Sequence, residues 1–268
     1  MFLFLFLFAF LNQASSFTPA PSPFPQITTG FSFPSFTPAS CSDGNLTCTG
    51  SVTSHDGYLS LTPEPQPGYP TLPLNQVGRV LYKYPLLAWP AVILTKFTFR
   101  ILTSLYSTES ADGLTFIMAP DSSPSPSDSY GSYLGIMDPA QDGHAGGQLA
   151  VEFDTYKNTG DLDANHIAVV TKSVIHPIQA RSLNDTGIDL KSGRDIKVLI
   201  VLDGRTKSIR VHVGYAFDPI GETFLEVPID IPNTLPSFIY VGFTASTGLL
   251  IERHQILNWN LASFPINK

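Results

Sequence analysis

The chain has 268 residues, of which 43% are hydrophobic and only 14% are charged. This composition excludes a disordered chain, because so much apolar material is enough to form a large core. The net charge is -7, and the 15 Lys and Arg residues are scattered, which argues against nucleic acid as a partner. The length suits one large all-β domain, since sandwiches commonly exceed 200 residues.

The N-terminal part predicts a secretory signal peptide followed by an extended leader. Residues 1–16 contain an apolar run at 2–11 and then small residues, as signal peptides do. Residues 17–30 are rich in proline, which is typical of an extended segment. No later stretch offers the ~18 continuous apolar residues that a transmembrane helix needs. We therefore expect a secreted, extracellular or apoplastic protein without a membrane anchor, folded over 31–263 with a tail at 264–268.

Cys41 and Cys48 are the two cysteines of the chain, and six residues separate them. In an oxidising compartment this spacing predicts one short disulfide loop; the alternative is two unpaired thiols. Asn45 and Asn184 each begin an Asn-x-Thr sequon. We therefore expect both asparagines to be glycosylation sites of a secreted glycoprotein.

The next predicted elements are strands separated by proline-rich loops. Strand-like runs at 58–61 and 80–82 flank a proline cluster at 63–73, which reads as a surface loop. At 97–101 apolar and polar residues alternate with a period of two, the pattern of a half-buried strand.

An acidic cluster follows in the middle of the chain. Glu152, Asp154 and Asn158 have spacings of two and four, so an extended strand places them on one face. Asp161 and His166 follow in a loop just before another strand-like run. A turn can therefore bring five ligand-type side chains together.

Three carboxylates held close together need a countercharge, because they repel one another and are costly to desolvate. A divalent cation, or two, would supply it. Oxygen ligands suit calcium, and an imidazole added to carboxylates suits manganese or a similar transition ion. The alternative is a solvated strand face carrying Glu152 and Asp154, with His166 as a strand-edge histidine. The spacing alone does not decide between a metal site and a solvated strand face.

The clearest hairpin signal lies towards the C-terminus. Residues 197–202 and 208–215 are strand-like and flank the polar turn Asp203-Gly204. No sustained apolar helical pattern occurs anywhere in the chain. The pattern as a whole favours an all-β sandwich.

Several ordered sequence blocks resemble the legume lectin family. They are Ala-Asp-Gly-Leu-Thr-Phe at 111–116, Tyr-Leu-Gly-Ile at 133–136, the acidic block at 151–158, Asn-His-Ile at 165–167 and the block at 241–248. The pattern is closest to the extracellular domain of plant lectin receptor-like kinases, without the kinase. The resemblance covers roughly residues 31–261, and such a series is more specific than one motif.

The resemblance implies a jelly-roll β-sandwich with two neighbouring metal sites. Its transition-metal site, for Mn²⁺ or a similar ion, would use Glu152, Asp154, Asp161 and His166. Its Ca²⁺ site would use Asp154, the main-chain carbonyl of Tyr156, Asn158 and Asp161.

The resemblance also implies a sugar site beside the calcium site. Asp112 would follow a cis peptide bond after Ala111 and accept hydrogen bonds from sugar hydroxyls. The amide of Asn158 would donate to the sugar, and the Tyr156 ring would offer an apolar face, because sugars present hydroxyls at their edges and C–H groups on their faces.

Two departures from the family pattern concern this sugar site. Ser132 stands where many members have a glycine, so its side chain could narrow the pocket. The specificity loop after Gly248 is very short, and Leu249 leads almost at once into the last strand. Together they predict a shallow site that binds simple monosaccharides weakly or not at all.

The sequence therefore predicts a secreted plant lectin-like protein that binds a glycan or glycoprotein without catalysis. One alternative is a lectin fold with weak or lost sugar binding, acting in defence signalling or binding an apolar ligand near Leu249 and Leu250. A glycoside hydrolase is less favoured, since Tyr156 and Lys157 stand where Glu-x-Asp-x-x-Glu enzymes need a third carboxylate. Family members often dimerise through sheet edges, so a homodimer is a further expectation.

Overall fold

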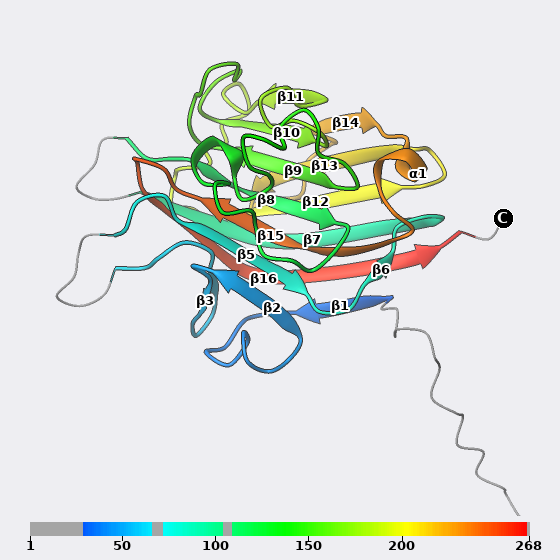
Figure 1. Cartoon of the computed structure of the whole chain (residues 1–268), viewed down its shortest axis with the longest axis horizontal. Helices are drawn as coiled ribbons and strands as arrows, with labels where there is room; N and C mark the ends of the chain where they lie inside the picture. The colour runs from blue at the N-terminus through cyan, green and yellow to red at the C-terminus, as the bar shows by residue number, and fades with distance from the viewer. Residues whose placement is uncertain (1–28, 66–71, 104–108, 267–268) are drawn as a thin grey trace, which may run out of the picture.

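The computed structural model describes residues 29–65, 72–103 and 109–266. Their strands form two antiparallel sheets of eight strands each, layered face to face (Figure 1). The described residues contain little helix: the 3-10 turn η1 (Gly131–Tyr133) and the single turn α1 (Ile231–Thr234). The predicted all-β sandwich is confirmed. The predicted signal peptide at 1–16 and nearly all of the leader lie outside the described residues.

The first sheet is built around its two longest strands, which pair with each other along their lengths. It also contains the predicted hairpin, which the structure confirms. In spatial order its strands are β14 (Leu225–Pro228), β13 (Ser208–Tyr215), β12 (Ile196–Asp203), β7 (Ala91–Thr103), β16 (Glu252–Pro265), β4 (Leu59–Ser60) and β3 (Thr53–Ser54), and β1 (Gly30–Phe33) pairs with β16.

The second sheet carries the acidic block in one of its inner strands. In spatial order its strands are β11 (Gln179–Ser182), β10 (His166–Val170), β9 (Leu149–Asp154), β8 (Gly113–Ala119), β15 (Phe238–Ser246), β5 (Val77–Tyr82) and β2 (Leu46–Gly50), and β6 (Leu86–Leu87) pairs with β15.

Aromatic side chains fill the space between the two sheets. Trp259 of β16 packs edge-on against Phe243 of β15, with ring centroids 4.8 Å apart, and Phe243 packs against Phe97 of β7 at 4.9 Å. All three side chains are fully buried. Burying each such side chain contributes about 2–3 kcal/mol to the stability of the folded state. The alternation at 97–101 thus encodes the inner face of the first sheet.

The outer face of the second sheet is also covered, and this cover positions the candidate site. Val151 and Phe153 of β9 point into the core between the sheets, so Ala150, Glu152 and Asp154 point the other way. On that outer side Ala150 packs against residues of the segment 134–137, in a second apolar cluster. Polar side chains on this face are therefore buried as well.

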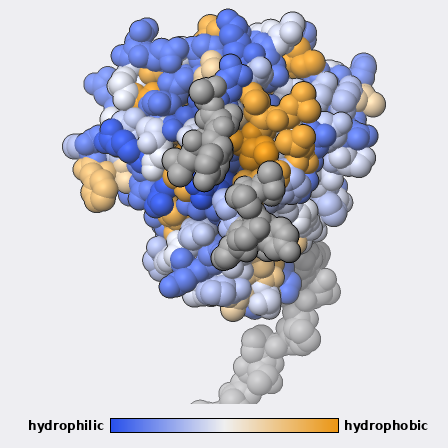
Figure 2. Space-filling view, turned by 90° about the vertical axis from the view of Figure 1, so that its left-hand side faces the viewer, coloured by the Kyte–Doolittle hydropathy of each residue, from blue (hydrophilic) through white to orange (hydrophobic). Residues whose placement is uncertain are grey.

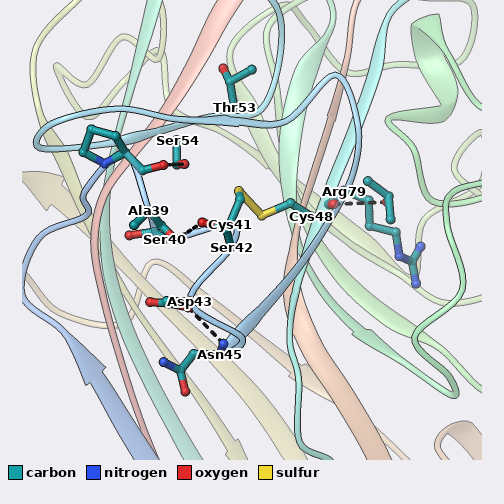
Figure 3. Close-up of a disulfide and its surroundings, with 12 residues drawn as sticks. Ala39, Ser40, Cys41, Ser42, Asp43, Asn45, Cys48, Thr53, Ser54 and Arg79 are labelled. Carbon is teal, nitrogen blue, oxygen red and sulfur yellow. Dashed lines mark hydrogen bonds between the residues drawn. A yellow bond between two sulfur atoms is a disulfide. The ribbon is translucent and has the colours of Figure 1, made fainter.

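The predicted disulfide between Cys41 and Cys48 is confirmed, and it ties β2 to the turn that precedes it (Figure 3). Asn45 and Asn184 both lie exposed, as glycan acceptors must, and their glycosylation stays a prediction. Within the described ranges, no helix has the length and apolar character to cross a membrane.

Candidate metal and ligand site

The strand register brings four chain segments together at one end of the second sheet. Ser246 at the end of β15 pairs with Gly113, Gly113 pairs with Asp154 at the end of β9, and Asp154 pairs with His166 at the start of β10. These residues form one row across four neighbouring strands. The loops that leave the row therefore meet at the same end.

Glu152, Asp154 and His166 form a buried cluster in which one ligand atom from each residue lies within 4.8 Å of the others. The three residues are only 1–2% exposed. The Nδ1–H of His166 donates to the main-chain carbonyl of Asp163 at 2.8 Å, and its Nε2 faces Glu152 Oε1 at 3.7 Å. Such a bond fixes the imidazole with Nε2 directed into the cluster, as in metal-binding histidines.

The electrostatics of this cluster call for a positive charge. Burial raises the pKa of Glu152 and raises that of Asp154 well above the usual range, and the charge of Asp161 raises both further. The pKa of His166 is also raised, because Glu152 outweighs the opposing effect of burial. The Oε2 atom of Glu152 is buried without a hydrogen-bond partner. Two buried carboxylates, an imidazole and an unsatisfied oxygen fit a divalent cation.

The turn after β9 holds the remaining predicted metal ligands. Asp154 Oδ1 accepts from the Tyr156 amide at 2.7 Å, and Asp161 Oδ2 accepts from the Asn158 amide at 2.6 Å. Asp161 is not part of the cluster of Glu152, Asp154 and His166, but its charge raises the pKa of Asp154. The Asn158 Nδ2 atom is buried without a hydrogen-bond partner. The turn thus gathers the predicted ligands, and their binding of metal stays a prediction.

Asp112 lies beside this turn and follows a cis peptide bond after Ala111, as the resemblance implied. Its main-chain carbonyl accepts from the Thr155 amide at 3.1 Å, which ties the start of β8 to the turn after β9. The side chain is 5% exposed, and Oδ2 has no hydrogen-bond partner. Burial raises the pKa of Asp112 to about 7, with a further contribution from the charge of Glu252.

Gly248 explains how the main chain approaches Asp112 so closely. A Cβ atom at this position would lie 3.1 Å from Asp112 Oδ2, which is closer than most side chains tolerate. The nearby Gly248 main-chain N–H opposes the rise in the pKa of Asp112. Gly248 therefore lets the connection between β15 and β16 pass Asp112 without displacing its carboxylate.

Asp112 lines a hollow of about 660 Å³. The hollow lies at the end of the molecule where β15 turns into β16, and Figure 2 shows a hydrophobic patch on that end. All five predicted sugar-contact residues line it: Asp112, Ser132, Tyr156, Asn158 and Leu249. Ser132 is half-buried and leaves the hollow open, while Leu249 is 82% exposed at its edge. The sugar-binding roles of these residues remain predictions.

Sequence reasoning missed other residues around the hollow. Asn75 reaches it from the segment before β5, and Asp128, Tyr130 and Asp138 come from the segment that covers the second sheet. Asp128 and Tyr130 immediately precede Gly131 and Ser132, so proximity in sequence was a signal for them. No local signal pointed to Asn75, because only strand pairing brings it here.

A second omission is the buried network around Glu252, the first residue of β16. Its carboxylate accepts from Ser110 at 2.9 Å, from Thr155 at 2.5 Å and from His254 at 2.9 Å. Burial alone would raise the pKa of Glu252, but these bonds, led by that from His254, lower it overall. The network links Ser110, just before Asp112, and Thr155, in the turn after β9, to the start of β16. Its sequence signal is Glu-x-His at the start of the last strand.

The pKa of Asp112 predicts an unusual pH dependence for the metal-free protein. A carboxyl whose pKa is about 7 in the folded state, against an ordinary 3.8, binds more protons folded than unfolded between these values. The free energy of unfolding must therefore fall as the pH rises from about 4 to 7. Glu152, Asp154 and His166, whose pKa values are also raised, act with the same sign.

Thermal unfolding of the chelated protein at pH 5 and pH 7 checks this prediction. We expect the melting temperature to be higher at pH 5, and the difference to shrink in Asp112→Asn. A chelated wild type that melts higher at pH 7 would contradict the burial of uncompensated carboxylates.

Comparison with known proteins identifies the family. Residues 28–268 match the family model of the legume lectin domain. The lectin alpha chain of Lablab purpureus is 32% identical, over 87% of this chain and 83% of its own. Probable L-type lectin-domain containing receptor kinase S.5 of Arabidopsis thaliana is 32% identical over 79% of this chain, and the match spans 33% of the kinase.

Solved structures agree with the sequence comparison. Lectin UEA-II, solved in complex with galactose, has a TM-score of 0.74 and 26% identity, with coverage of 89% of this chain and 100% of that chain. The family model, the relatives and the jelly-roll sandwich all agree with the resemblance found in the sequence blocks. The chain belongs to the legume lectin family.

Proposed function

We propose that this protein is a secreted lectin that binds glycans without catalysis, in a hollow organised by Ca²⁺ and Mn²⁺ or a similar ion. One observation carries the proposal above others. Asp112 and Asn158 both line the hollow, and each has a buried polar side-chain atom without a protein partner. Buried polar groups without partners are rare in proteins, so they mark a place where a polar ligand completes the hydrogen bonding.

The cluster of Glu152, Asp154 and His166 would hold the transition ion together with Asp161. Asp154, the Tyr156 carbonyl, Asn158 and Asp161 would hold calcium. The ions supply the countercharge that the buried carboxylates lack and so fix the turn after β9. Oxygen donors suit calcium and the added imidazole suits a transition ion.

Each of the five predicted sugar-contact residues offers a chemical group that suits a sugar. Asp112 Oδ2 accepts from a hydroxyl, and Asn158 Nδ2 donates to one. The main-chain N–H of Ser132 is a further donor. Tyr156 and Leu249 offer apolar surface to the C–H face of a sugar ring. The relative solved with galactose supports this ligand class.

A non-catalytic role fits the carboxylates better than hydrolysis does. A retaining glycosidase needs two accessible carboxyl groups about 5–5.5 Å apart, one on each side of the bond that breaks. Glu152 is 1% exposed, lies against His166 and does not line the hollow. We therefore propose that Glu152 serves the metal site.

A second candidate follows from the apolar edge of the hollow. Leu249 is 82% exposed and lies next to Leu250, which also lines the hollow. Exposed leucines at a cavity mouth suit an apolar ligand, so a lectin fold that binds such a ligand instead of a sugar is the alternative.

Replacing Asp112 tests the proposed function. We expect Asp112→Asn to weaken glycan binding by about 100-fold, since hydrogen bonds to charged groups contribute about 1.5–3 kcal/mol and 1.4 kcal/mol is tenfold. The measurement is a glycan array followed by titration of the best ligand. Asp56→Asn, at an exposed position away from the hollow, is the matched control.

Two outcomes would count against the proposal. Equal glycan binding by wild type and Asp112→Asn would place the glycan site elsewhere. Binding of apolar ligands by wild type, without binding of any glycan, would favour the alternative at Leu249 and Leu250.

A further inference from the structure

Arg79 is a buried cation that forms no ion pair among the described residues. It lies on β5, and its side chain is on the outer face of the second sheet, because Val80 belongs to the core between the sheets. The residue is 6% exposed and its Nε has no hydrogen-bond partner. It appears in none of the ion pairs among the described residues. Figure 3 shows the guanidinium extending away from the nearby disulfide.

A charge in this position is costly, because an unpaired buried ion loses its hydration without gaining a compensating interaction. Burial lowers the pKa of Arg79 to about 10, and the charge of Asp121 opposes the change. The guanidinium therefore stays protonated at neutral pH. Asp121 acts on this charge only from a distance, since the two form no ion pair in the part of the chain that the structure describes.

Arg79 lines a hollow of about 450 Å³ that is separate from the hollow around Asp112, and it also borders a smaller one of about 240 Å³. Ala140 is the one residue that the 450 Å³ hollow shares with the hollow around Asp112. Besides the acidic Asp121, the wall around Arg79 contains polar side chains that can donate hydrogen bonds and apolar ones that can contact a hydrocarbon group. The polar ones include Gln141, His144 and Gln148, and the apolar ones Pro120, Pro124 and Ile136.

We infer that this hollow binds a small organic carboxylate. A guanidinium presents a planar fork of donors that matches the two oxygens of a carboxylate. Asp121 on the same wall partly offsets the single charge of Arg79, so the hollow favours a singly charged anion over doubly charged phosphate. The apolar residues favour an anion with a hydrocarbon part over an inorganic ion. The inference is independent of the proposed glycan site.

Isothermal titration with benzoate tests this site, and benzamide serves as the uncharged probe of the same shape. We expect benzoate to bind wild type at least tenfold more tightly than benzamide or inorganic phosphate. Galacturonate in a separate titration distinguishes a sugar acid from a free aromatic acid as the preferred source of the carboxylate. Absence of binding by both carboxylates would overturn the inference.

Arg79→Met assigns any binding to this residue. We expect at least a tenfold loss of benzoate affinity, with glycan binding unchanged and thermal stability equal to or above that of wild type, because an unpaired buried charge is removed. Arg205→Met, which removes an exposed arginine paired with Asp203, is the matched control. Equal benzoate affinity in Arg79→Met and wild type would overturn the assignment.

A measurement on wild type keeps the test decisive if Arg79→Met does not fold. The ¹⁵N–¹H resonance of the Arg79 Nε should shift as benzoate is added and stay in place with benzamide. A resonance that does not respond to benzoate would overturn the inference.

Discussion

Removing divalent cations from the wild-type protein at pH 7 is expected to lower its melting temperature by roughly 5–10 °C. A ligand present at 100 times its dissociation constant stabilises the folded state by about 2.7 kcal/mol, and each kcal/mol shifts the melting point of a domain this size by about 2–4 °C. The physical reason is the burial of Glu152 and Asp154, which are 1% and 2% exposed. Without a cation nothing in the described cluster neutralises both carboxylates.

Calorimetry with and without an exhaustive chelator measures this shift. Asp154→Asn should lose most of the dependence on metal, since Asp154 is the carboxylate expected to serve both ions. Asp56→Asn, at an exposed position, should retain the full shift. Re-addition of Ca²⁺ and Mn²⁺ should restore the wild-type melting temperature. A wild type that melts at the same temperature before and after chelation would exclude a structural role for metal at this cluster.

Glu252→Ala is expected to destabilise the protein by about 3–5 kcal/mol, because it leaves three buried donors without their acceptor and each such loss costs about 1–3 kcal/mol. The substitution leaves the His254 imidazole and the hydroxyls of Ser110 and Thr155 without their shared acceptor. Ser110 lies close to Asp112 in sequence, and Thr155 lies in the turn after β9. The positions of the residues that line the hollow around Asp112 should therefore change as well. Urea unfolding monitored by fluorescence measures the change in free energy.

Two further variants separate the network from the general effect of losing a glutamate. Glu252→Gln keeps an acceptor oxygen and should be less destabilising than Glu252→Ala. Glu226→Ala removes an exposed glutamate on β14 and should change the free energy of unfolding by no more than about 0.5 kcal/mol. If Glu252→Ala were as mild as Glu226→Ala, the network would not hold the site together.

The fold could be predicted from local patterns wherever a strand has one face in the core between the sheets. The alternation at 97–101 and the hairpin turn at Asp203 are properties of neighbouring residues, so the sequence contains them directly. The segment at 134–137, which packs on the outer face of the second sheet, lacks this alternation of apolar and polar residues. Glu152 and Asp154 lie on the same outer face and are buried, although their pattern was equally compatible with exposed strand residues.

The candidate site was predictable in part for the same reason. Glu152, Asp154 and His166 are close in sequence, and their spacing places them on one side of two neighbouring strands. Asp112 came from the resemblance, because only long-range pairing of β8 with β9 brings it to the turn. Arg79 occurs in a strand-like stretch where no local pattern tells a buried charge from an exposed one, whereas Glu252 had the local signal Glu-x-His.

Glycan binding by the metal-free protein tests the central claim most directly. The best glycan ligand is titrated into wild type after exhaustive chelation, and again after Ca²⁺ and Mn²⁺ are restored. A metal-organised glycan site predicts loss of binding in the first titration and its full recovery in the second. Equal affinity in both titrations would contradict the claim that metal organises the site.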